Sequence, residues 1–143
     1  MNIDICEVMK SIYNSIDEKN MTIAELYGGT AYYSKCIEKI KQYESVVVVG
    51  AGNHGKKLLN MFDLEKISSN VNVCDNNPKL QGNIIGGHTI VSIKDAVSNY
   101  KDSLFVITPA GYENELLQQI CNLGVSYKDI LIFIMMYSGL RME

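Results

Sequence analysis

A glycine-rich stretch between two apolar runs is the feature that most constrains how this chain can fold. It reads VVVVGAGNHG over Val46 to Gly55, so that a β-branched run leads directly into the pattern G-x-G-x-x-G. The helical pattern KKLLNMF follows, and Asp75 closes the next apolar run about 20 residues after the last glycine. A strand, this glycine pattern, a helix and a later acidic residue together make the dinucleotide-binding fingerprint of a βαβ unit. The sequence therefore predicts a fold that holds a nucleotide.

Short apolar runs alternate with helical patterns from residue 46 onwards. The four valines at 46–49 are typical of a strand buried on both faces of a parallel sheet. This alternation predicts an α/β fold, a Rossmann-like doubly wound and mainly parallel sheet with helices on both faces. The predicted strands are 46–49, 71–74, 104–108 and 130–135, with short extended pieces at 84–85 and 89–91. The predicted helices are 56–62, 93–100 and 113–123.

The chain before residue 45 has a different pattern. Apolar residues recur at helical spacing over 3–16, and two further helical runs begin near Thr22 and at Thr30. We therefore expect a helical N-terminal extension over residues 1–44 and a Rossmann-like nucleotide-binding domain over residues 45–143.

Each glycine of the pattern has a separate expected role. Gly50 allows the tight turn that leaves the first strand, and Gly52 lets the backbone approach a pyrophosphate. Gly55 allows the following helix to pack closely against the sheet. The free backbone N–H groups at that helix N-terminus then face the phosphates.

Four other residues complete the expected binding set. Asp75 is placed to accept hydrogen bonds from a ribose diol and to repel a 2′-phosphate, which favours NAD over NADP. Asn53 and His54 lie inside the loop, where His54 either contacts the ligand, acts as an acid or base, or faces solvent. Thr108 follows a later strand and is either a ligand contact or an ordinary strand end. The predicted cofactor-binding residues are Gly50, Gly52, Asn53, His54, Gly55, Asp75 and Thr108.

A self-sufficient dehydrogenase or epimerase is not indicated. Short-chain dehydrogenases and sugar epimerases use a Tyr-x-x-x-Lys pair, and none of the nine tyrosines has a lysine four residues later. Tyr32 and Lys35 are three residues apart and precede the first predicted strand. There is also no Gly-x-Ser-x-Gly elbow, so no catalytic residue is assigned and the question of enzymatic activity stays open.

Charge and hydropathy indicate which partners to expect. The net charge of −3 and a pI near 5.4 predict no nucleic-acid partner and no anionic membrane surface. No apolar stretch approaches the roughly 20 residues that span a bilayer, and the N-terminus lacks a signal-peptide pattern, so a cytoplasmic location is expected. The four cysteines are widely spaced and predict reduced thiols rather than a metal site. The N-terminal helices and the apolar C-terminal segment are candidates for a homodimer contact.

Three segments together resemble a known group of domains: VVVVGAGNHGKKLL, VNVCDNNPKLQGNIIGGHTIVSI and LFVITPAGYENELLQQICNLG. They are similar to the small Rossmann-like domains of bacterial glycan-modifying proteins, over about residues 45–135. These include the N-terminal nucleotide-sugar-binding domain of sugar acetyltransferases, methyltransferase-associated domains, and short chains labelled nucleoside-diphosphate-sugar epimerase or dehydrogenase. The resemblance implies binding at the glycine loop and Asp75. The acyl-transfer domain and the Tyr/Lys pair are absent, so those activities are not carried over.

Three functions are therefore open. The first is a nucleotide-binding module of bacterial surface-glycan (polysaccharide) metabolism, which binds NAD(H) or a nucleotide sugar without complete catalytic machinery. The second is an NAD-dependent nucleotide-sugar dehydrogenase or epimerase whose site a partner subunit completes. The third is a regulatory domain that senses the NAD state. The sequence does not choose among NAD, a nucleotide sugar and CoA as the ligand.

Overall fold

A computed structural model describes residues 7–8, 30–65, 67, 70–109 and 111–133 of the chain. Within them, a six-stranded sheet has the strand order β3-β4-β2-β1-β5-β6. Its strands are β1 (Val46–Val49), β2 (Val71–Cys74), β3 (Ile84–Ile85), β4 (His88–Val91), β5 (Leu104–Ile107) and β6 (Ile130–Ile132). Its helices are α3 (Thr30–Lys41), α4 (Asn53–Glu65), α5 (Ile93–Asn99) and α6 (Glu113–Asn122), with a short 3₁₀ helix, η2 (Tyr127–Asp129).

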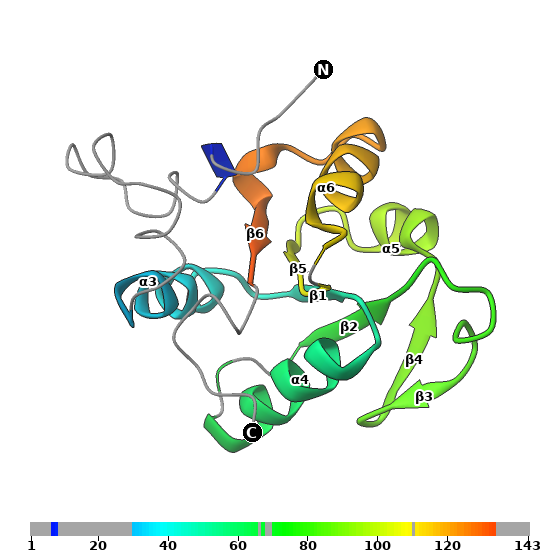
Figure 1. The fold of residues 1–143 in the computed structure, drawn as a ribbon, viewed down its shortest axis with the longest axis horizontal. Coiled ribbons are helices and arrows are strands. Elements are labelled where there is room, and N and C mark those ends of the chain that lie inside the picture. The colour runs from blue at the N-terminus through cyan, green and yellow to red at the C-terminus, as the bar shows by residue number, and fades with distance from the viewer. Residues whose placement is uncertain (1–6, 9–29, 66, 68–69, 110, 134–143) are drawn as a thin grey trace.

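All neighbouring strands are parallel except β3 and β4, which are antiparallel, and β1 pairs with both β2 and β5. Val46 pairs with Val71 on one side and with Leu104 on the other. Figure 1 shows α5 and α6 on one face of the sheet and α3 and α4 on the other. The predicted doubly wound α/β sheet is confirmed.

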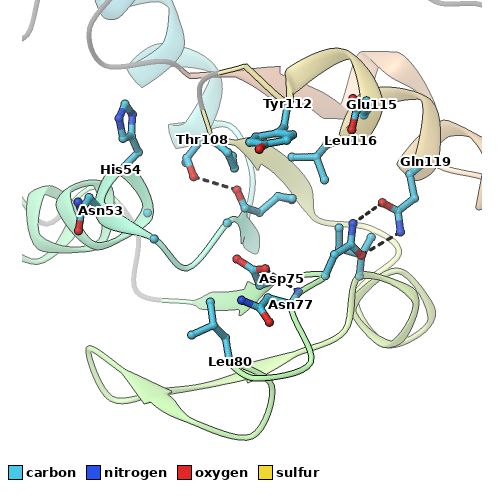
Figure 2. Close-up of a pocket in the computed structure, with 17 residues that line it drawn as sticks. Asn53, His54, Asp75, Asn77, Leu80, Thr108, Tyr112, Glu115, Leu116 and Gln119 are labelled. Carbon is cyan, nitrogen blue, oxygen red and sulfur yellow. Dashed lines mark hydrogen bonds between the residues drawn. The ribbon is translucent and has the colours of Figure 1, made fainter.

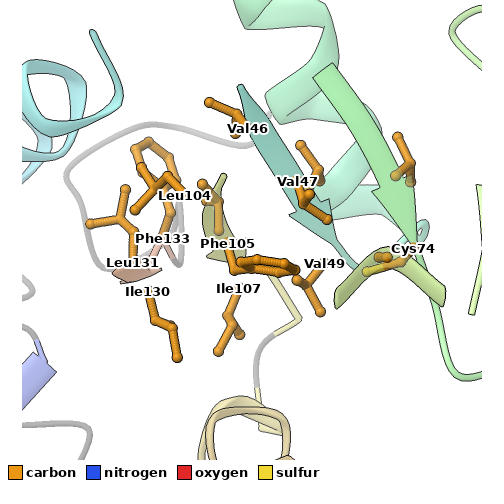
Figure 3. Packing of buried hydrophobic residues seen from close by; sticks show 14 of the residues in the cluster. Val46, Val47, Val49, Cys74, Leu104, Phe105, Ile107, Ile130, Leu131 and Phe133 are labelled. Atoms are coloured by element: carbon orange, nitrogen blue, oxygen red, sulfur yellow. The ribbon is translucent and has the colours of Figure 1, made fainter. Parts of the chain in front are cut away.

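The core lies around the central strands because their side chains are buried on both faces. Every residue of β1, β5 and β6 is buried. Figure 3 shows side chains of this buried cluster, and Phe105 and Phe133, which directly follows β6, are among its largest fully buried members. Burial of large apolar side chains at about 25 cal/mol per Å² is the main favourable term in folding. The sheet is thus a rigid support for the loops at its edges.

The connection from β2 to β4 contains no helix. Residues 75–83 form turns and lead into the antiparallel hairpin of β3 and β4, whose tight turn contains Gly86 and Gly87, both with positive φ. The predicted extended pieces on either side of this glycine pair are confirmed. His88 begins β4.

The element boundaries differ from the prediction mainly at the first crossover helix. The pattern KKLLNMF predicted a helix from residue 56, whereas α4 begins at Asn53. The helix therefore includes Asn53, His54 and Gly55, which apolar periodicity alone assigns to a loop. Of the predicted helices before residue 30, the structure describes only residues 7–8, which are helical, and the predicted dimer segment after residue 133 lies outside the described residues. The division into an extension and a domain at residue 44 stays a prediction.

Candidate functional site

The turn from β1 into α4 is held by two glycines that protein atoms surround. Gly50 has a φ of +111°, and a Cβ there would lie 2.7 Å from both Thr108 Oγ1 and Pro109 Cγ. A Cβ on Gly55 would collide with the carbonyl oxygen of Gly50. The sequence therefore needs glycine at both positions for the fold itself.

Gly52 differs from these two glycines. It has no positive φ, and a Cβ there would meet no atom of the described residues within 4 Å. Packing within the described chain therefore gives no reason for glycine at this position. The residue faces an open space immediately before α4.

The N-terminus of α4 supplies hydrogen-bond donors to this space. The first intrahelical bond in this region runs from the N–H of Lys56 to the carbonyl of Gly52, at 3.0 Å. The N–H groups of the preceding helical residues have no acceptor within the helix, as at every helix N-terminus. The first turn carries no acidic side chain, so its partial positive charge is available to an anion.

Asp75 lies at the carboxyl end of β2 and connects two loops. Its Oδ2 accepts a hydrogen bond from the N–H of Ala51 at 2.8 Å, and its Oδ1 accepts one from the N–H of Asn77 at 2.8 Å. Each carboxylate oxygen accepts two hydrogen bonds, so each retains one unused position. The carboxylate is thus held in place and still able to accept hydrogen bonds from a ligand.

These groups surround one cavity of about 740 Å³, within the usual range for small-molecule sites. Figure 2 shows it between the glycine loop, the end of β2 and the first turns of α6. The residues that line it are Val49, Gly50, Gly52, Asn53, His54, Gly55, Asp75, Asn76, Asn77, Leu80, Ile93, Thr108, Pro109, Tyr112, Glu115, Leu116 and Gln119.

The charge of the cavity wall limits how it can hold an anion. Asp75 and Glu115 contribute carboxylates, and no lysine or arginine is among the described residues that line the cavity. A phosphate here would be bound by the backbone N–H groups of α4. Such binding suits a diphosphate diester better than a terminal phosphate with two negative charges.

The structure brings all seven predicted binding residues to this cavity, but their surroundings differ. Thr108 is 1% exposed, and its hydroxyl donates a hydrogen bond to the carbonyl of Val49 at 2.9 Å. It therefore supports the end of β1. His54 is half-buried, its Nδ1 has no hydrogen-bond partner among the described residues, and Figure 2 shows its ring directed away from Asp75.

Sequence reasoning missed the wall that α6 contributes. Tyr112, Glu115, Leu116 and Gln119 all line the cavity. They occur at positions i, i+3, i+4 and i+7, the spacing of one helix face. This spacing, in the predicted helix that follows the strand end at Thr108, could have identified them as residues that face the crevice.

The described thiols near the sheet do not have the properties of nucleophiles. Burial raises the pKa of Cys74 far above its ordinary value, and the neighbouring charge of Asp75 raises it further. Burial also raises the pKa of Cys121. Both thiols therefore stay protonated near neutral pH, and the thiolate is the reactive form.

The described residues contain no group of three or more His, Cys, Asp or Glu side chains that could hold a metal ion. None of their helices is long and apolar enough to span a membrane.

Comparison with known proteins gives a family and a fold. A family model described as C2185-like, N-terminal matches residues 42–131, more than half of the chain. No curated protein matches the chain.

Two solved structures share the fold at low sequence identity. One is RSP, a Rex-family repressor, with 21% identity, a TM-score of 0.50, and coverage of 66% of this chain and 48% of that chain. The present chain thus spans about half the length of the repressor. The other is UDP-D-quinovosamine 4-dehydrogenase from Vibrio fischeri, with 20% identity, a TM-score of 0.50, and coverage of 58% and 74%. At this identity, these likenesses show the Rossmann-type fold.

The prediction of no nucleic-acid partner was wrong. RSP is a repressor, and it has also been crystallised with β-NAD⁺ and operator DNA; that structure matches at 16% identity over 71% of this chain and 55% of that one, with a TM-score of 0.49. The prediction relied on the net charge of −3, which is a sum over the whole chain. Such a sum does not describe the charge of any one surface, so it does not exclude a nucleic-acid partner.

Proposed function

The chain belongs to the C2185-like, N-terminal family, and we propose that it is an NAD(H)-binding domain. In this proposal the diphosphate lies on the N-terminus of α4, against Gly52. The diol of one ribose donates hydrogen bonds to the free positions of Asp75.

The observation that carries the proposal is the open position of Gly52 in an otherwise crowded loop. Gly50 and Gly55 are required by neighbouring protein atoms, whereas a Cβ on Gly52 would enter free space. A pyrophosphate that must approach the backbone gives a reason for glycine at this position. The unpaired N–H groups of α4 in the same space favour an anion.

Asp75 supports NAD(H) over NADP(H). Its carboxylate is fixed by two backbone N–H groups and lines the cavity. A 2′-phosphate placed against it would meet a like charge, with no lysine or arginine on the described cavity wall to offset the repulsion.

A nucleotide sugar is the second candidate. Its diphosphate would use the same N–H groups of α4, and the resemblance to domains of glycan-modifying proteins favours a place in surface-glycan metabolism. The two candidates differ at the half of the ligand that lies beyond the phosphates.

Calorimetric titration of the chain with NAD⁺, NADH, NADP⁺, UDP-glucose and CoA tests the proposal. We expect NAD⁺ to bind with a Kd of about 1–100 μM and NADP⁺ to bind at least about tenfold more weakly. Tighter binding of UDP-glucose than of NAD⁺ would select the second candidate. The nucleotide-binding proposal fails if the folded protein binds none of these ligands more tightly than about 1 mM.

Two variants connect binding to the proposed contacts. Gly52→Val should weaken NAD⁺ binding about a hundredfold because its side chain occupies the space of the phosphates, and Gly52→Ala should have a smaller effect. Asp75→Ala should reduce the preference for NAD⁺ over NADP⁺ to about twofold. This ratio separates a ligand contact from a general loss of stability, which affects both ligands alike.

A further inference from the structure

Two amide side chains meet across the cavity. Asn76 directly follows Asp75 at the end of β2, and Gln119 lies on α6. Asn76 Nδ2 donates to Gln119 Oε1 at 2.7 Å, and Gln119 Nε2 donates to Asn76 Oδ1 at 3.1 Å. Both residues line the cavity, and Figure 2 shows the two bonds to Gln119 as dashed lines. The pair joins the loop after β2 to helix α6.

This amide pair has unused hydrogen-bonding capacity. Each side-chain amide has two donor hydrogens and two acceptor positions, and the pair uses one of each per residue. Asn76 is exposed and Gln119 is half-buried, so water replaces the mutual bonds at small cost when the pair opens. The amides can therefore replace their mutual hydrogen bonds with bonds to a ligand that carries a matching set of donors and acceptors.

Apolar side chains line the same cavity as the amides. Leu80 comes from the segment after β2, Ile93 begins α5, and Leu116 is one turn before Gln119 on α6. Apolar walls together with adjacent donors and acceptors suit a flat heteroaromatic ring that stacks on its faces and forms hydrogen bonds at its edge.

The position of the pair relates this ring to the ribose. Asn76 is the immediate neighbour of Asp75, which the proposed function assigns to the ribose diol. A base is attached to the same sugar, so it lies within a few ångströms of that contact. Asn76, and through its hydrogen bonds Gln119, therefore lie near the expected position of the base.

We propose that Asn76 and Gln119 form the nucleobase-recognition contact of this site and that they bind the adenine of the dinucleotide. An Asn or Gln amide pairs with adenine by accepting from the N6 amino group and donating to a neighbouring ring nitrogen. On binding, the amides exchange their mutual hydrogen bonds for bonds to the base. This inference rests on the proposed function, because the base is placed from the ribose contact of Asp75.

An analogue of NAD⁺ with a changed adenine edge tests this contact. In the etheno analogue, a two-carbon bridge joins N1 and N6 of adenine, so the N6 donor is lost while both riboses and the diphosphate are unchanged. Calorimetry on the chain should give binding of NAD⁺ about tenfold tighter than binding of the analogue, the value of one or two hydrogen bonds.

Removal of the amides should abolish this difference. In the variant Asn76→Ala/Gln119→Ala, NAD⁺ should bind about tenfold more weakly than to the unmodified chain, while affinity for the etheno analogue stays within about twofold. Gln119→Met keeps the length of the side chain without the amide and should give about a threefold loss for NAD⁺ alone.

The matched control is another pair of amide side chains, both of which lie on α6 and neither of which lines the cavity. Gln118 Nε2 donates to Asn114 Oδ1 at 3.4 Å, and Asn114 is exposed. Asn114→Ala/Gln118→Ala should leave both affinities unchanged. Thermal unfolding of the two double variants verifies that both are folded.

The outcomes separate the two proposals. If the variant without Asn76 and Gln119 binds NAD⁺ as tightly as the unmodified chain or more tightly, the pair only covers the cavity and the inference is wrong. Equal losses for NAD⁺ and the analogue would indicate a structural role and would also overturn it. In both cases nucleotide binding stands. If the unmodified chain binds neither ligand, the proposed function fails and this inference fails with it.

Discussion

The two ends of the sheet use similar polar residues in different ways. At the amino ends of the strands, Tyr43 donates to Asp129 at 2.7 Å, and the hydroxyls of Ser45 and Ser103 lie 2.6 Å apart. At the carboxyl ends, Asp75 and the amide pair border a cavity of about 740 Å³ and keep unused hydrogen-bonding positions.

This difference follows from the geometry of a parallel sheet. Tyr43 and Ser45 precede β1, Asp129 precedes β6 and Ser103 precedes β5, so their contacts join strand starts to each other. The helices begin beyond the strand ends at the opposite edge, where loops separate and leave a crevice. The polar side chains at the amino ends thus hold each other in place, whereas those at the carboxyl ends keep positions free for the ligand of the proposed function. Four predictions test this division.

The largest expected effect is the loss of stability on substitution of Gly55. This residue lies at the carboxyl end of the sheet, but a side chain there would meet the backbone of Gly50. Gly55→Val should lower the free energy of unfolding by about 3 kcal/mol or more, because its side chain collides with the carbonyl of Gly50. Urea unfolding followed by circular dichroism measures this. The matched variant Gly52→Val should change stability by less than about 0.5 kcal/mol. Similar losses of stability in both variants would contradict this division, because Gly52 would then be required for folding as well.

A smaller effect is expected at Tyr43. Tyr43→Phe removes its hydrogen bond to Asp129 and should cost about 1.5 kcal/mol, with NAD⁺ affinity unchanged. Tyr127→Phe is the control, because the Tyr127 hydroxyl has no hydrogen-bond partner among the described residues. A change in NAD⁺ affinity on Tyr43→Phe would contradict the division between the two ends.

The same tyrosine predicts a pH dependence. Burial, aided by the hydrogen bond to Asp129, raises the pKa of Tyr43 above its ordinary value of 10.0. The folded state thus holds this proton more tightly than the unfolded state. The resulting stability is complete below about pH 10 and is lost as pH rises above it. The stability difference between the chain and Tyr43→Phe should therefore decrease from about pH 9 to about pH 11 in urea unfolding.

The smallest effect concerns the two serines. Ser103 is 1% exposed, so Ser45→Ala leaves the Ser103 hydroxyl buried without this partner. The substitution should lower the free energy of unfolding by about 1 kcal/mol. Ser45→Ala/Ser103→Ala should be more stable than Ser45→Ala, because no polar group is left unpaired. A double-mutant cycle, measured by thermal unfolding, gives the coupling free energy between the two hydroxyls. Additive losses would mean that the hydroxyl pair does not act as a unit.

Much of the fold followed from local patterns. Local patterns predicted four strands at the correct place. These patterns are the valine run of β1, the apolar runs of β2 and β5, and the glycine turn before β4. The start of α4 was misplaced by three residues, because Asn53, His54 and Gly55 lack apolar periodicity and their helical conformation comes from packing of the loop against the sheet.

The sequence by itself determined the sheet, the glycine loop and Asp75, since each depends on residues close together in the chain. Only the tertiary structure decided that α6 forms the opposite wall and that Asn76 meets Gln119, 43 residues away. It also decided that the hydroxyl of Thr108 is bonded to the end of β1. The physical reason is that periodicity reports which face of an element is buried, whereas contacts across a crevice depend on how strands and helices are placed in three dimensions.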